Sequence, residues 1–193
     1  MQTTSVVLVG VGGQGILLAS EIVAQAAGLA GFDVKTNEVH GMAQRGGSVI
    51  AQIRYGEKVY SPIIAKGTAS VLGSLERMEV LRYTDYLAPS GLAVVSSQKI
   101  VPVTASIGTV GYPEIDETLL KNYFPRLVYL EAVQEATKLG NPKAANTILL
   151  GAMSTQLDLP LDAWENAIRK SVKEKFVELN LQAFHLGRSL SAQ

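Results

Sequence analysis

Short apolar runs separated by glycines predict alternating strands and helices at the start of the chain. Residues 6–9 are β-branched or leucine without interruption, as in a strand buried on both faces of a parallel sheet. Residues 16–27 are apolar and long enough for a helix, and Gly28 and Gly31 suit its end. Residues 32–36 predict a second strand. The pattern therefore indicates a right-handed βαβ unit, which is half of a Rossmann-like domain.

The middle of the chain departs from this alternation. Residues 48–55 predict a strand, residues 56–58 a hairpin turn, and residues 59–64 an antiparallel return strand. Residues 70–87 have helical spacing. Further elements are expected as strands at 92–96 and 127–130, helices at 116–122, 131–139 and 146–157, and mostly loop at 101–112.

The last part of the chain predicts one long amphipathic helix. Asp162 suits its N-cap, with Glu165 three residues later as the capping-box partner. An apolar stripe follows in steps of three or four residues at Trp164, Ile168, Val172, Phe176, Leu179, Ala183 and Leu186. We expect this stripe in the core, with packing between subunits as the alternative.

The elements together predict one α/β domain over residues 1–193. We expect a three-layer α/β/α arrangement with a Rossmann-like sheet. The sheet should be mostly parallel with an antiparallel hairpin, and a long C-terminal helix should follow it.

Composition narrows the function classes. Lys and Arg number 17, as do Asp and Glu, which argues against a sequence-independent nucleic-acid binder. The chain has no cysteine, so it cannot itself ligate an iron–sulfur cluster or supply a catalytic thiol. With only two histidines and no cysteine, the composition argues against a zinc site built from this chain alone. Without a long apolar run or a basic leader, we expect a cytoplasmic protein with no membrane partner.

A glycine turn follows the first predicted strand and carries the main candidate chemistry. Gly10, Gly12 and Gly15 form the pattern Gly-x-Gly-x-x-Gly directly before a predicted helix. Backbone N–H groups and the helix N-terminus of such a turn can bind an anion. Tight packing of the helix on the sheet explains these glycines equally well. Gln14 could point its amide at a ligand or cap the turn.

Residues 37–48 are the second unusual segment, because they gather an acid, a histidine, an arginine and two glycines close to the first turn. Arg45 offers a planar fork for phosphate or carboxylate. Gly46 and Gly47 permit backbone conformations that other residues would strain. We expect a functional or interface role for Arg45 and its glycines, and an ordinary loop role for His40.

Other signatures argue against a self-contained enzyme. A dinucleotide site normally has an acidic residue at the tip of the second strand, and Glu38 comes late for that role. The chain has no Walker A pattern, no Gly-x-Ser-x-Gly elbow, no His-Glu-x-x-His helix and no Gly-Asp-Gly motif. We therefore assign no catalytic residue and no metal ligand to it.

Several stretches fit one known family, namely residues 10–15, 44–48, 140–146 with 150–151, and 180–184 with Gly187. There the sequence resembles the gamma subunit, or gamma domain, of 2-oxoacid:ferredoxin oxidoreductases. The match covers almost the whole chain in order. Residues 38–47 are closest to the small subunit of the indolepyruvate type, whereas other gamma subunits more often carry Tyr-Gly-x-Glu-x-Arg-Gly-Gly.

The resemblance implies an accessory subunit that is inactive alone. The whole enzyme would oxidatively decarboxylate a 2-oxoacid of the pyruvate, ketoisovalerate, 2-oxoglutarate or indolepyruvate class, form an acyl-CoA and reduce ferredoxin. Thiamine diphosphate, Mg²⁺ and 4Fe–4S clusters would lie in partner subunits, and this chain would bind coenzyme A or control its access. The candidate cofactor-binding residues are Gly10, Gly12, Gly13, Gln14, Gly15, Arg45, Gly46 and Gly47.

Two alternatives stay open at this point. The chain could be a stand-alone NAD(P)-binding Rossmann oxidoreductase. The glycine turn and, to a lesser degree, Glu38 support that function. It could also be a nucleotide-sensing regulatory module, since a phosphate turn without catalytic groups would suffice. The sequence leaves the particular 2-oxoacid unassigned, as it does the partner-facing surface and whether the isolated chain forms a homodimer.

Overall fold

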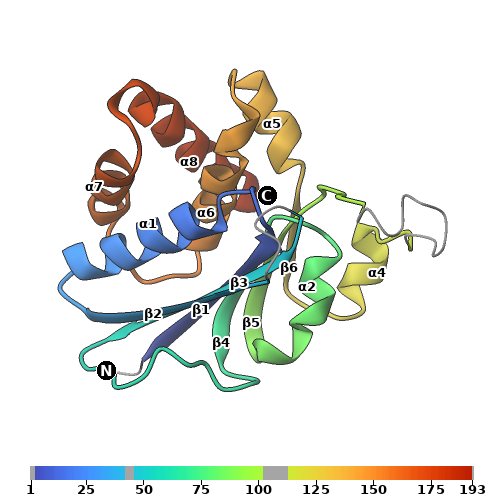
Figure 1. Ribbon diagram of the computed structural model, residues 1–193, viewed down its shortest axis with the longest axis horizontal. Coiled ribbons are helices and arrows are strands. Elements are labelled where there is room, and N and C mark those ends of the chain that lie inside the picture. Colours follow the sequence, from blue (N-terminus) through green and yellow to red (C-terminus); the bar gives the residue numbers. More distant parts are fainter. Residues whose placement is uncertain (1–2, 42–45, 102–112, 193) are drawn as a thin grey trace.

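One mixed β-sheet organises the molecule. In the residues that the computed structural model describes (3–41, 46–101 and 113–192), six strands lie in the order β2-β3-β1-β4-β5-β6 (Figure 1). β3 is antiparallel to β1 and β2, and the pairs β1–β4, β4–β5 and β5–β6 are parallel. The strands are β1 Thr4–Val11, β2 Asp33–His40, β3 Ser48–Gly56, β4 Ala69–Ser74, β5 Leu87–Ser96 and β6 Leu127–Leu130.

Helices cover both faces of the sheet (Figure 1). One face carries α1 Ile16–Leu29, α5 Ala132–Lys138, α6 Ala145–Ser154, α7 Leu161–Ser171 and α8 Val177–Ser191, and the other carries α2 Glu79–Arg82 and α4 Glu117–Lys121. Short 3₁₀ turns lie at Thr84–Tyr86, Pro142–Ala144 and Glu174–Phe176.

Two hydrophobic cores lie between these layers. β1 lies between β3 and β4, and its residues Val6 to Val9 are fully buried. Because strand side chains alternate between faces, Val6 and Leu8 belong to one core and Val7 and Val9 to the other. The predicted three-layer α/β/α class is therefore confirmed.

The antiparallel hairpin predicted between residues 48–55 and 59–64 is wrong. Residues 59–64 form no strand, and β3 pairs with β2 instead, so the antiparallel connection is the segment that ends in Gly46 and Gly47. Pro62 has no N–H to donate to a ladder. The loop is held by the Arg54 guanidinium, whose Nη1 donates to Ser61 O at 2.9 Å and Ile63 O at 3.2 Å. β3 also lies between β1 and β2. These two strands run parallel, as the βαβ unit implied, but they are not neighbours in the sheet.

The helix predicted over residues 70–87 is also wrong. Its first part is β4, and only residues 79–82 and 84–86 are helical. β4 lies between β1 and β5, where Val71 and Leu72 are fully buried on opposite faces. Burial on both faces outweighed the helical spacing, which cannot separate a short buried strand from a helix.

The C-terminal helix begins earlier than predicted and is interrupted. α7 has Pro160 as its N-cap, so Asp162 lies in the first turn and is not the cap. Val172 takes an extended conformation (φ −104°, ψ 155°) that ends α7, and α8 is the long C-terminal helix. The stripe is core at Trp164 and Ile168, which are fully buried, whereas Phe176 is 36% exposed.

The remaining predicted elements are confirmed with shifted bounds: β5 begins at Leu87 and not at residue 92, and α6 ends at Ser154 and not at residue 157. β6 has the predicted bounds, and the Asp116 carboxylate caps α4 by accepting from Leu119 N at 2.8 Å. Of the predicted loop 101–112, residues 102–112 lie outside the described residues. The single domain over residues 1–193 stays a prediction. Among the described helices, none is long and apolar enough to cross a membrane.

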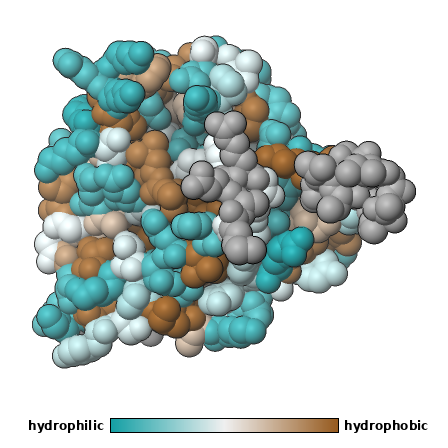
Figure 2. Space-filling model, in the orientation of Figure 1, coloured by the Kyte–Doolittle hydropathy of each residue, from teal (hydrophilic) through white to brown (hydrophobic). Residues whose placement is uncertain are grey.

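The surface shows mixed hydropathy. On the face drawn in Figure 2, hydrophobic residues lie in separate groups among hydrophilic ones. Large exposed apolar side chains come from several separate segments of the described chain: Leu17, Leu29, Val39, Tyr60 (89%), Ile63, Val101, Tyr123, Leu161 and Phe176. Hydropathy alone therefore does not mark a partner-binding surface on the described residues of that face.

Acid should weaken the attachment of the 57–60 loop to β2. The Asp33 carboxylate accepts from Lys35 Nζ at 2.8 Å and from Val59 N at 3.0 Å, and the Lys35 bond first of all lowers the Asp33 pKa to about 2. Because the folded-state pKa is depressed, the stabilisation is present above pH 4 and is lost as the pH falls towards 2. Unfolding measured from pH 5 to 2 should show a smaller loss of stability for Asp33→Asn than for the wild type. Equal losses would contradict this role.

Candidate functional site

The glycine turn joins β1 to α1 at the carboxyl edge of the sheet. Gly13 (φ 103°) and Gly15 (φ 83°) are left-handed, a conformation that strains residues with a Cβ. Gly15 is the N-cap of α1 and supplies no side-chain cap. The first-turn N–H groups of this helix, which have no intrahelical partner, therefore donate no hydrogen bond to a capping side chain at Gly15.

The second glycine segment lies directly against the first, as the sequence predicted. Gly12 N donates to Gly47 O at 2.8 Å, and Gly46 N donates to Gly12 O at 3.4 Å. Gly46 is also left-handed, with φ 80°. We call the residues Gly12, Gly13, Gly15, Gly46 and Gly47 the glycine cradle.

A cavity of about 500 Å³ opens beside the cradle. Its lining is the backbone of the turn together with apolar side chains and one imidazole: Val11, Gly12, Gly13, Gly15, Ile16, Leu17, His40 and Val49. No described residue accepts a hydrogen bond from the N–H of Gly13 or Gly15. With the positive end of α1, these donors suit an anionic group.

Gly10 and Gln14 have structural contacts within the chain. A Cβ on Gly10 would lie 2.8 Å from Gln14 Oε1 and 2.9 Å from Ile16 Cδ1. Gly10 is therefore needed for the close packing of the turn and α1 on the sheet. The Gln14 amide caps the turn, since Oε1 accepts from Val11 N at 2.7 Å and Nε2 donates to Leu75 O at 2.8 Å. Their contact with a ligand stays a prediction.

The other sequence candidates are placed as follows. Arg45 lies outside the described residues. His40 ends β2, is exposed and lines the cavity, which sequence reasoning did not expect. Glu38 accepts a hydrogen bond from Ser20 Oγ at 2.5 Å, so its carboxylate already has a partner on α1. This contact does not favour the ribose role of Glu38, which was the weaker of the two features that supported the NAD(P) alternative.

Buried amides behind the cradle connect it to the C-terminal helices. Asn146 Nδ2 in α6 donates to Gly15 O at 3.3 Å, and Thr147 Oγ1 lies 3.2 Å from Asn146 Oδ1. Thr147 also donates to Asn180 Oδ1 of α8 at 2.7 Å. Sequence reasoning did not assign these residues to the site, although a buried polar run within an apolar helix was a usable signal.

A smaller cavity of about 350 Å³ lies on the other side of the turn. It is lined by Gly13, Gln14, Gly15, Leu18, Leu75, Val133, Pro142, Lys143, Ala145 and Asn146. Within the described ranges, no group of three His, Cys, Asp or Glu residues could hold a metal ion.

The fold and this edge define a Rossmann-like α/β protein with a candidate anion site at the carboxyl ends of β1 and β2, beside the start of β3. Comparison with known families makes the class specific. The pyruvate ferredoxin/flavodoxin oxidoreductase family matches residues 5–190, and the chain belongs to that family.

Curated relatives narrow the class. The chain is 42% identical over 187 residues to the indolepyruvate oxidoreductase subunit IorB of Archaeoglobus fulgidus, covering 95% of this chain and 92% of that protein. It is 40% identical to IorB of Thermococcus kodakarensis, covering 97% and 95%. The 2-oxoglutarate synthase subunit KorC of Methanocaldococcus jannaschii is more distant, at 29% identity over 96% of this chain and 92% of that protein.

Solved structures share the fold. The gamma subunit of a keto/oxoacid ferredoxin oxidoreductase from Geobacter sulfurreducens has a TM-score of 0.71 at 24% identity, covering 98% of each chain. A 2-oxoglutarate:ferredoxin oxidoreductase from Magnetococcus marinus, with 2-oxoglutarate, coenzyme A and succinyl-CoA bound, has a TM-score of 0.74 at 21% identity. That match covers all of this chain and 31% of the other, so the same fold occurs there within a longer polypeptide.

Proposed function

We propose that this chain is the gamma-type subunit of a multisubunit 2-oxoacid:ferredoxin oxidoreductase of the indolepyruvate type. The observation that carries the proposal is the near-complete, two-sided coverage of IorB relatives at 40–42% identity. The proposed complex acts in the cytoplasm. Its other subunits hold thiamine diphosphate, Mg²⁺ and the 4Fe–4S clusters and pass electrons to ferredoxin. The stand-alone NAD(P) oxidoreductase and the nucleotide-sensing module are not favoured.

In this proposal the glycine cradle binds a phosphate group of coenzyme A. The N–H groups of Gly13 and Gly15, from which no described residue accepts a hydrogen bond, and the α1 N-terminus provide donors, and the cavity of about 500 Å³ beside them has room for part of that molecule. Coenzyme A supplies the thiol that accepts the acyl group. This chain's residues bind and orient the phosphate, and the apolar side chains of Ile16, Leu17 and Val49 exclude water from it.

Reconstitution of the complex tests the proposed function. The chain is co-expressed with its thiamine- and cluster-bearing partner, and coenzyme A-dependent reduction of ferredoxin is measured with indolepyruvate, pyruvate, 2-oxoisovalerate and 2-oxoglutarate. We expect stable co-purification, and turnover only when both polypeptides are present. Hydride transfer to NAD(P) by the isolated chain, or full turnover by the partner alone, would overturn the proposal.

A matched pair of leucines in α1 tests the anion site. Leu17 is 48% exposed and lines the cavity, whereas Leu29 is 44% exposed at the other end of the helix. Leu17→Glu places a negative charge at the helix end that attracts the phosphate, so the Kd for coenzyme A should rise about tenfold or more. Leu29→Glu should leave the Kd within about twofold. Equal titration curves for the two variants would exclude this cavity.

Arg45 gives a further test, based on the sequence alone. Arg45→Ala should impair acyl-CoA formation by the assembled complex while the subunit stays folded. Loss of a buried contact to an anion would cost about 2–5 kcal/mol, whereas loss of an exposed ion pair would cost under about 1 kcal/mol. Unchanged turnover and unchanged KM for coenzyme A would remove Arg45 from the site.

A further inference from the structure

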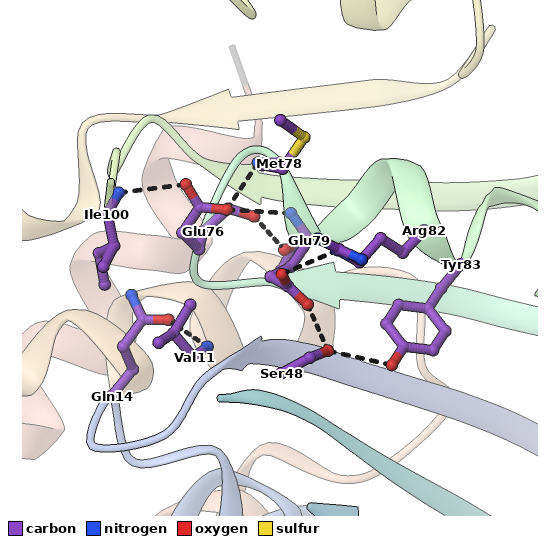
Figure 3. A network of polar contacts seen from close by, with 10 residues as sticks. Val11, Gln14, Ser48, Glu76, Met78, Glu79, Arg82, Tyr83 and Ile100 are labelled. Atoms are coloured by element: carbon purple, nitrogen blue, oxygen red, sulfur yellow. Dashed lines mark hydrogen bonds and ion pairs between the residues drawn. The ribbon is translucent and has the colours of Figure 1, made fainter. Parts of the chain in front are cut away.

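The turn after β4 contacts both segments of the glycine cradle. Residues 75–78 join β4 to α2, and Glu79 is the first residue of that helix (Figure 3). We count Glu79 with the turn. Leu75 N donates to Val9 O at 3.0 Å, which fixes the turn to the neighbouring β1. We call it the β4–α2 turn.

The first contact reaches the Gly12–Gly15 segment through Gln14. Its Nε2 donates to Leu75 O at 2.8 Å, while its Oε1 accepts from Val11 N at 2.7 Å. One amide therefore joins the end of β1 to the end of β4, next to the left-handed Gly13 and Gly15.

The second contact reaches Gly46 and Gly47 through Ser48, the first residue of β3. Ser48 Oγ donates to the Glu79 carboxylate and lies 3.1 Å from Tyr83 Oη (Figure 3). The Glu79 side chain is 9% exposed, and Arg82 Nε lies 3.1 Å from its other oxygen. Ser48 is thus held where the glycines enter the strand.

The β4–α2 turn is itself held by buried polar contacts. The Glu76 carboxylate accepts from Met78 N at 2.7 Å, Glu79 N at 2.9 Å and Ile100 N at 3.2 Å. Glu76 is 1% exposed, and Ser74 Oγ donates to its carbonyl oxygen at 2.6 Å. A turn with so many internal bonds is a rigid support for Ser48 and Gln14.

We propose that Ser48 is a positioning residue: held by Glu79 and Tyr83, it fixes Gly46 and Gly47 against Gly12 in the geometry that receives the anion. This rests on the proposed function. Glycines have no side chains to hold them and lose the most conformational entropy on ordering. Gly46 N and Gly12 O are 3.4 Å apart, at the long end for a hydrogen bond. Without Ser48, the ligand would have to order this segment when it binds.

The test compares Ser48→Ala with two controls in the reconstituted complex. Ser48→Thr keeps the hydroxyl group. Ser97→Ala removes a similar contact elsewhere, because Ser97 Oγ donates to Glu131 Oε2 at 2.8 Å. We expect Ser48→Ala to raise the KM and Kd for coenzyme A about tenfold with kcat unchanged. Ser48→Thr should restore wild-type values, and Ser97→Ala should not alter them.

Hydrogen exchange on the full chain decides the positioning role without any ligand. The Gly12 amide, which donates to Gly47 O, should exchange about tenfold faster in Ser48→Ala than in Ser97→Ala, with core amides unchanged. Equal exchange at Gly12 would overturn the inference. So would unchanged coenzyme A binding in Ser48→Ala when the wild type binds. If the wild type does not bind coenzyme A, the proposed anion site fails, and exchange at Gly12 alone decides the role of Ser48.

Discussion

Gly187→Ala is expected to destabilise the protein more than any other Gly→Ala change in a helix. A Cβ on Gly187 in α8 would lie 1.9 Å from Ile148 O in α6, and one on Gly151 in α6 would lie 2.0 Å from Phe184 O. Backbone atoms cannot rotate away as a side chain can, so the two helices must separate. We expect a loss of at least about 3 kcal/mol in the free energy of unfolding, measured with urea.

Gly28→Ala is the matched control. Gly28 lies in α1, and a Cβ there would meet nothing within 4 Å. Because alanine is the better helix former, this change should stabilise the protein by about 0.5–1 kcal/mol. If Gly187→Ala lowers the free energy of unfolding by no more than the loss of an ordinary surface contact does, then α6 and α8 do not approach each other as closely as described.

Gly15→Ala should disrupt the candidate site most strongly. The left-handed backbone at Gly15 (φ 83°) costs about 1–2 kcal/mol for a residue with a Cβ. The new Cβ would also lie 2.7 Å from Asn146 Nδ2, the buried amide that donates to Gly15 O. Moving Asn146 away breaks that bond and disturbs its contact with Thr147. Coenzyme A binding by the complex should fall below detection in calorimetry.

Gly31→Ala separates backbone strain from loss of the site. Gly31 has a similar φ of 87° at the far end of α1, and a Cβ there would meet nothing within 4 Å. The Gly31→Ala variant should lose about 1–2 kcal/mol in the free energy of unfolding and should bind coenzyme A normally. Equal effects of the two changes on binding would indicate that strain alone, and not the Asn146 contact, explains the loss.

The sequence predicted those parts of the fold whose signals are local. Residues 6–9, the glycine turn and Asp116 each carry their own signal, and the matching elements formed where expected. Pairing partners were not predictable in this way. Residues 59–64 look like a return strand until Pro62 and the Arg54 contacts are seen. β4 resembled part of a helix because its burial depends on β1 and β5, which lie elsewhere in the sequence.

The candidate site was predictable to a similar degree. The prediction that Gly46 and Gly47 lie next to the first glycine turn is correct. For Gln14 the sequence left open whether its amide contacts a ligand or caps the turn. It did not identify Ser48, because a lone serine carries no pattern of its own. It also left unused the polar pair Asn146 and Thr147 at the start of an apolar helix, which was a usable signal. Their importance arises only from contacts with distant residues.

The contact between Gly15 and Asn146 also has a consequence for biosynthesis. It joins positions 131 residues apart, and Asn146 is in turn linked through Thr147 to Asn180. During translation the N-terminal glycines leave the ribosome long before α6 and α8 exist, and contacts of such long range form slowly. The nascent N-terminal half therefore emerges without the helices that complete it, so chaperone demand should be greatest before the final 50 or so residues are made.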